Sequence, residues 1–126
     1  AVTNRPGFNT GNWKAQPRLV NIFASWCLPC IAEAPQLMAL KKAGVRIEGV
    51  AVRDKGEAVA KFVNRHGNPY ASIGMDKTGQ LQLALGATGV PASYTLDSSG
   101  RIVYQHIGDI RADQVADLVA RVKAAK

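Results

Sequence analysis

The two cysteines of this chain stand two residues apart, in the segment Phe23-Ala24-Ser25-Trp26-Cys27-Leu28-Pro29-Cys30. Residues 18–25 form a short, mostly apolar, β-favouring run, which is typical of a strand buried on both faces. After the cysteines, apolar side chains at Ile31, Ala34 and Leu37 follow helical spacing. A Cys-x-x-Cys at a strand-to-helix junction places one sulfur at the start of the helix, where thiol chemistry can be tuned.

Size and cysteine content limit what this pair can do. With 126 residues, we expect a single domain, residues 1–126, which is long enough to bury a sizeable core. Two cysteines cannot form a disulfide scaffold, so the hydrophobic core must stabilise the fold. The pair is therefore expected to be reactive or metal-binding rather than structural.

The net charge of +7 comes from 16 basic and 9 acidic residues that are scattered along the chain. Lys41-Lys42 is the only adjacent basic pair, whereas nucleic-acid binders cluster their basic residues on one face. We therefore expect a solvated basic surface and no nucleic-acid partner.

No apolar stretch approaches the ~18 residues of a membrane helix. Because the chain starts at Ala1, we expect a processed product, with any signal peptide or anchor outside this sequence.

Periodicity and turn residues predict the order of the elements. Residues 1–17, with Phe8 and Trp13 as isolated anchors, are expected to be an irregular lead-in. The last predicted helix carries Ile110 on its apolar side. A β-α-β unit followed by a β-β-α unit makes an α/β fold, a mixed β-sheet flanked by helices on both faces. The predicted strands are 18–25, 45–52, 70–73, 92–96 and 101–106, and the predicted helices are 29–43, 54–65, 78–85 and 109–125.

Two motifs together resemble the thioredoxin fold. The first is the segment from Trp26 to Cys30, with Pro35 five residues after the second cysteine. The second is Gly89-Val90-Pro91 followed by residues 94–100, which resembles that fold's cis-proline loop and the hairpin after it. The match runs from about Trp13 to the C-terminus and implies a thioredoxin fold.

Three features resemble one branch of this superfamily, the extracytoplasmic thiol:disulfide oxidoreductases of the CcmG/DsbE, ResA and TlpA type. They are residues 21–27, Glu33 three residues after Cys30, and Gly67-Asn68-Pro69-Tyr70. Asn21 stands where ordinary thioredoxins bury an aspartate, which argues against a general cytosolic thioredoxin. The chain also departs from the CcmG pattern, with Ala92 in place of a frequent glutamate, Ala51-Val52 in place of Asn-Tyr, and Ile31 in place of a basic residue.

The cysteine pair has three possible roles. In the redox reading, Cys27 is the nucleophile, because unpaired N–H groups and the dipole at a helix start favour its thiolate. Cys30, one turn further on, is then the resolving thiol. A zinc half-site would need two more ligands, and only His66 and His106 are available as histidines. An inert disulfide is the third possibility. Peroxiredoxin-type chemistry is disfavoured because Ala24 stands where a Thr or Ser is wanted.

Glu33 lies at i,i+3 from Cys30, which places it on the same side of the helix. A carboxylate near a thiol can accept its proton or raise its pKa, and the resemblance implies that role. The alternative is a surface glutamate, since helix starts favour acidic residues.

The remaining predicted site residues surround the cysteines. The resemblance implies that Pro91 is a cis-proline and that the backbone of Val90 pairs with substrate; a trans turn proline is the alternative. Trp26 is expected to shape the substrate groove beside Cys27 unless it is a core residue. Leu28 and Pro29, between the cysteines, are expected to contact substrate and to set the reducing power.

The resemblance implies a thiol–disulfide oxidoreductase of the periplasm, tethered to the inner membrane by an N-terminal segment absent from this chain. We expect it to be a monomer without cofactor or metal beyond a redox-active Cys27–Cys30 disulfide. Its implied client is the Cys-x-x-Cys of apocytochrome c or a cytochrome c maturation protein, and its implied reductant is a membrane protein of the DsbD/CcdA type. The alternatives are a general or oxidising thiol-exchange protein and a non-catalytic module that binds a client.

Overall fold

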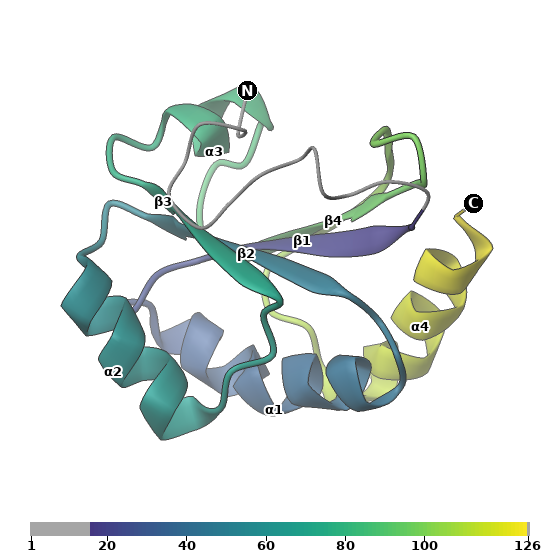
Figure 1. Ribbon diagram of the computed structural model, residues 1–126, viewed down its shortest axis with the longest axis horizontal. Helices are drawn as coiled ribbons and strands as arrows, with labels where there is room; N and C mark the ends of the chain where they lie inside the picture. The colour runs from purple at the N-terminus through teal and green to yellow at the C-terminus, as the bar shows by residue number, and fades with distance from the viewer. Residues whose placement is uncertain (1–15, 126) are drawn as a thin grey trace.

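A five-stranded mixed β-sheet forms the centre of the computed structural model, which describes residues 16–125 (Figure 1). Phe8, Trp13 and nearly all of the predicted lead-in lie outside the described residues. In chain order the elements are β1 (Arg18–Phe23), α1 (Leu28–Lys42), β2 (Ile47–Val52), α2 (Gly56–His66), β3 (Ser72–Asp76), α3 (Gln80–Ala84), β4 (Ala92–Leu96), β5 (Ile102–Ile107), the 3-10 turn η2 (Ala112–Gln114) and α4 (Val115–Ala124).

The strand order is β3-β2-β1-β4-β5. β1, β2 and β3 run parallel, whereas β4 is antiparallel to β1 and forms a hairpin with β5. β1 is the central strand, and Asn21 in it lies opposite Gly49 of β2 and Ser93 of β4. All six residues of β1 are buried, which confirms the prediction of a strand covered on both faces.

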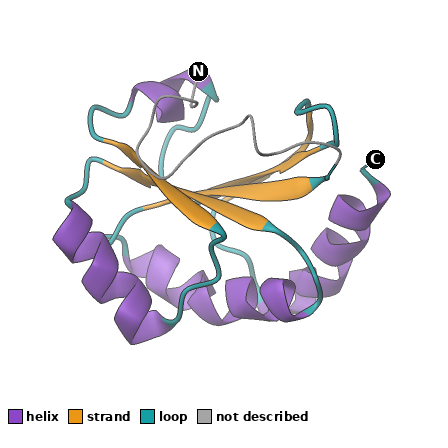
Figure 2. Ribbon diagram, viewed as in Figure 1, coloured by secondary structure: helices purple, strands orange, loops and turns teal. Residues whose placement is uncertain are grey.

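The helices cover the two faces of the sheet unequally. The steps from β1 to β2 and from β2 to β3 go in the same direction, so right-handed crossovers put α1 and α2 on the same face. α4 contacts α1 on that face, and the short α3 lies on the other (Figures 1 and 2). The predicted mixed sheet with helices on both faces is confirmed. Within residues 16–125, no helix combines the length and hydropathy needed to cross a bilayer.

The first helix ends where the sequence predicts. Gly44 has φ +94°, and its N–H donates to the carbonyl of Lys41. The N–H of Val45 donates to the carbonyl of Leu40. These two bonds form a Schellman motif, which requires the positive φ that glycine adopts without strain.

Two predicted boundaries, the end of the third strand and the start of the last helix, are wrong by more than two residues. The third strand covers Ser72–Asp76 instead of 70–73, because its register with β2 sets its position. The last helix begins at Val115 instead of 109, after a 3-10 turn. Ile110 therefore does not belong to the apolar side of α4. It lies before the helix, fully buried, where its N–H donates to Glu33.

Candidate functional site: a redox-active cysteine pair

The cysteine pair lies at the N-terminus of α1, directly after β1. Cys27 is the N-cap residue, and its sulfur accepts a hydrogen bond from the backbone N–H of Cys30 at 3.2 Å. The two sulfurs are joined in a disulfide bond, and Cys27 is 5% exposed whereas Cys30 is 2% exposed. Because N–H groups of the first helical turn have no partners within the helix, this position stabilises a Cys27 thiolate when the disulfide is reduced.

The loop before β4 faces the cysteines. The carbonyl oxygen of Val90 lies 3.7 Å from the sulfur of Cys27, although the two residues are 63 positions apart. The Val90–Pro91 peptide bond is cis, as the resemblance implies. The carbonyl of Pro91 accepts a hydrogen bond from Gly108, which ties this loop to the end of β5. The structure thus brings together the two motifs that the sequence analysis singled out.

Glu33 lies one turn beyond Cys30 and is fully buried beneath the helix. One carboxyl oxygen accepts a hydrogen bond from the Asn21 amide at 2.9 Å, and the other accepts the Ile110 N–H at 3.1 Å. The alternative of a surface glutamate is therefore excluded.

Asn21 connects this carboxyl group to two further side chains. Its amide nitrogen also donates to the Ser93 hydroxyl at 3.0 Å, and its carbonyl oxygen accepts the Tyr70 hydroxyl at 2.7 Å. Asn21, Ser93 and Tyr70 are all buried, so every link of this network is shielded from water. Because buried polar groups are costly when unpaired, the network holds the Glu33 carboxyl in one position.

Burial changes the acidity of this network. Loss of water around Glu33 raises its pKa to about 7, against the opposing effect of the hydrogen bonds from Asn21 and Ile110. The pKa of Tyr70 is raised well above its usual value, first by burial and then by the negative charge of Glu33. With this pKa, the Glu33 carboxyl group can change its protonation state near neutral pH.

The loop between β2 and α2 fixes the segment that precedes Cys27. The Asp54 carboxylate accepts the N–H of Ser25 at 2.6 Å and the hydroxyl of Ser25 at 2.7 Å. The carbonyl of Arg53 accepts the indole N–H of Trp26 at 3.2 Å. Sequence reasoning missed this role of Asp54. The available signal was its place two residues after β2, because the carboxyl ends of adjacent parallel strands meet at one edge of a sheet.

Asp54→Ala should destabilise the oxidised protein by roughly 1–3 kcal/mol, because it leaves the Ser25 N–H and hydroxyl without their charged acceptor. Urea unfolding followed by circular dichroism measures this loss. Asp113→Ala removes an exposed carboxylate from η2 and is the matched control. Equal unfolding midpoints for the wild type and Asp54→Ala would show that the loop is held by other contacts.

The other predicted site residues form the surface around Cys27. Trp26 is 58% exposed and Leu28 is 77% exposed, so Trp26 is not a core residue. Pro29 is also exposed, Val90 is half-buried and Pro91 is buried. Within residues 16–125, no three His, Cys, Asp or Glu side chains gather into a metal-binding group.

Comparison with known proteins agrees with this geometry. The Redoxin family model matches residues 3–122. The thiol:disulfide interchange protein DsbE of Vibrio cholerae is 38% identical over 100 residues, covering 79% of this chain and 54% of the relative. The thiol:disulfide interchange protein CycY of Rhizobium leguminosarum is 38% identical over 104 residues, which cover 82% of this chain and 56% of that relative. The chain spans about half the length of these curated relatives.

Among solved structures, DsbF of Mycobacterium tuberculosis, determined in mixed oxidised and reduced forms, is similar with a TM-score of 0.79 and 25% identity. The similarity covers 94% of this chain and 87% of that one. With the thioredoxin-like sheet, the Cys27–Cys30 disulfide and the cis-Pro91 loop in place, these matches show that the chain belongs to the redoxin family and is similar to its thiol:disulfide interchange proteins.

Proposed function

We propose that this chain is the redox-active domain of a periplasmic thiol–disulfide oxidoreductase that reduces the Cys-x-x-Cys of apocytochrome c before haem attachment. The observation that carries the proposal is the Cys27–Cys30 disulfide at the start of a helix. The Val90 carbonyl oxygen lies 3.7 Å from the sulfur of Cys27, and Glu33 is buried in the next turn of the helix. The choice of client and compartment is supported by the resemblance to the CcmG/DsbE type and by the interchange proteins DsbE and CycY among its relatives.

The reaction transfers two electrons to the client. In the reduced protein, the Cys27 thiolate attacks one sulfur of the client disulfide, which forms a mixed disulfide and releases one client thiolate. The Cys30 thiolate then attacks the sulfur of Cys27. This step forms the Cys27–Cys30 disulfide, breaks the mixed disulfide and releases the second client thiolate. A membrane dithiol protein of the DsbD/CcdA type would return the two electrons by the same exchange in reverse.

Chain residues assist each step. The N-terminus of α1 favours the thiolate form of Cys27. Glu33, with its pKa near 7, would take the proton of the Cys30 thiol when Cys30 becomes the nucleophile. The backbone of Val90, beside Cys27, would pair with the client backbone as a neighbouring strand does, while Trp26, Leu28 and Pro29 offer exposed apolar contacts.

A trapping experiment tests the client. Cys30→Ser leaves Cys27 able to attack but removes the thiol that resolves the mixed disulfide, so the client should stay covalently bound. Mass spectrometry of the trapped species from periplasm is expected to identify apocytochrome c or a cytochrome c maturation protein. The double variant Cys27→Ser, Cys30→Ser is the matched control and should trap nothing.

Trapped clients without any cytochrome c maturation component would refute the choice of client. Measuring the reduction potential of the Cys27–Cys30 pair against glutathione distinguishes the direction of exchange. A value near −120 mV, typical of the strong oxidant DsbA, would favour a disulfide-forming protein, whereas a value near about −270 mV, typical of thioredoxin, would support a reductant.

A further inference from the structure

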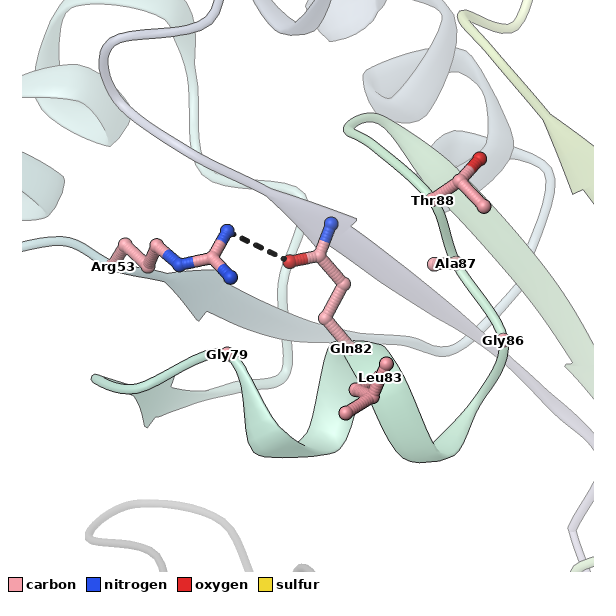
Figure 3. A pocket seen from close by; sticks show the side chains of 7 residues that line it. All are labelled: Arg53, Gly79, Gln82, Leu83, Gly86, Ala87 and Thr88. Atoms are coloured by element: carbon pink, nitrogen blue, oxygen red, sulfur yellow. Dashed lines mark hydrogen bonds between the residues drawn. The ribbon is translucent and has the colours of Figure 1, made fainter.

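A pocket of about 350 Å³ lies between the end of β2 and α3 (Figure 3). It combines one guanidinium group with the apolar side chain of Leu83 and with exposed backbone of the loop that leads to Val90. Its lining residues are Arg53, Gly79, Gln82, Leu83, Gly86, Ala87 and Thr88.

The structure holds the Arg53 side chain at this pocket in two ways. Arg53 has φ +46°, a left-handed conformation that costs a non-glycine residue free energy. Its guanidinium group lies against Gly79, where a Cβ atom would stand 2.8 Å from Nη2. A side chain at position 79 would therefore displace the guanidinium group. The Arg53 conformation and the absence of a side chain at Gly79 together place this cation over α3.

Most of the hydrogen-bonding capacity of Arg53 is unused. A guanidinium group has five N–H donors. The Nη1 atom of Arg53 donates one long hydrogen bond, of 3.4 Å, to the Gln82 side-chain oxygen (Figure 3). Among the ion pairs formed within residues 16–125, none includes Arg53. The pocket thus offers a positive charge and free donors to an incoming acceptor.

The pocket is linked to the cysteine site through two of its lining residues, Thr88 and Arg53. Thr88, in its wall, is two residues before Val90, whose carbonyl lies 3.7 Å from the sulfur of Cys27. The carbonyl of Arg53 accepts the indole N–H of Trp26, which precedes Cys27. A polypeptide that presents a cysteine to Cys27 along Val90 therefore has the pocket within reach of its neighbouring side chains.

We propose that this pocket is a specificity subsite for a glutamate or aspartate side chain of the client polypeptide, close in sequence to the client's reactive cysteine. The planar guanidinium group of Arg53 accommodates a carboxylate through paired N–H donors, and Leu83 contacts the aliphatic part of the acidic side chain. This proposal rests on the proposed thiol–disulfide exchange with a polypeptide client. It adds the sequence feature by which the client is selected.

Two synthetic disulfide-bonded peptides test the subsite. They share one sequence around a Cys-x-x-Cys, except that the positions flanking the cysteines carry glutamate in one peptide and glutamine in the other. The rate constant for reduction by the reduced protein is measured by stopped-flow tryptophan fluorescence. The wild type is expected to reduce the glutamate peptide about five-fold faster, the size typical of one partly exposed ion pair. This preference should shrink in 1 M salt, which screens the charge.

Arg53→Gln should abolish the preference, and Arg53→Lys should retain part of it, because lysine keeps the charge without the fork of donors. Lys55→Gln removes the same charge from the same loop but outside the pocket, so its preference should match that of the wild type. Equal rates for both peptides in the wild type, or an unchanged preference in Arg53→Gln, would refute the subsite while leaving the exchange activity in place. Failure to reduce either peptide would refute the exchange with polypeptides, and the subsite with it.

Discussion

Cys27→Ser is expected to lower the rate of disulfide reduction by on the order of a thousand-fold or more, as loss of a nucleophile does in enzymes that act through a covalent intermediate. A serine hydroxyl cannot replace the thiolate as attacking group or form a mixed disulfide. Cys30 is not expected to take over, because it lies inside the first turn of α1, whereas Cys27 occupies the N-cap position that favours a thiolate. Reduction of insulin disulfides by the reduced protein, followed by turbidity, measures the loss.

The control for this variant must separate lost chemistry from lost stability. Cys27→Ser removes the Cys27–Cys30 disulfide, so its unfolding should be compared with that of the reduced wild type rather than the oxidised one. Ser98→Ala removes a hydroxyl from the turn between β4 and β5, outside the contacts of the cysteine site, and it should keep most of the activity. Substantial turnover by a well-folded Cys27→Ser variant would reject the assignment of the nucleophile and favour a non-catalytic module that binds clients.

The order of the elements was predictable because each segment carries its own periodicity. The apolar run of β1 and the helical spacing after Cys30 are local signals that tertiary contacts reinforce. The start of α4 was not predictable in the same way. Helical spacing extends back to Ile110, but in the folded protein its N–H donates to a carboxyl group 77 residues earlier in the chain. A hydrogen bond between distant segments thus overrides the local helical pattern.

The candidate site also contains some features that the sequence signals and others that only contacts between distant segments determine. The Cys-x-x-Cys and the Val90-Pro91 motif could be paired through the resemblance, and the structure places them 3.7 Å apart at Val90 and Cys27. The complete burial of Glu33 could not be inferred from its i,i+3 spacing, because that spacing sets the side of the helix and not what packs against it. The contributions of Asp54 and Tyr70 depend on partners at least 29 residues away. The place of Asp54 after β2 was the one available signal for its role, and no local pattern points to the partner of Tyr70.

Glu33 is expected to make the stability of the oxidised protein depend on pH. Its pKa is about 7 in the folded protein, against an ordinary value of 4.5. Between these values the folded state keeps a proton that the unfolded state releases, so the stabilising contribution is complete below pH 4.5 and is lost as pH rises through 7. A difference of about 2.5 pKa units corresponds to a loss of roughly 3 kcal/mol. Above this range the contribution stays constant.

Urea unfolding of the oxidised wild type and of Glu33→Gln, measured from pH 4.5 to 8, isolates this contribution from those of other titrating groups. The difference in free energy of unfolding between the two proteins should fall by roughly 3 kcal/mol across the range, in favour of the variant at high pH. The absolute stability of Glu33→Gln also depends on how its amide fits beside two donors, the Asn21 amide and the Ile110 N–H, but that fit does not titrate. Glu57→Gln makes the same substitution at an exposed position of α2 and is the matched control. Parallel curves for the wild type and Glu33→Gln would mean that the buried carboxyl does not titrate near neutral pH, and they would also remove it as the proton acceptor for Cys30.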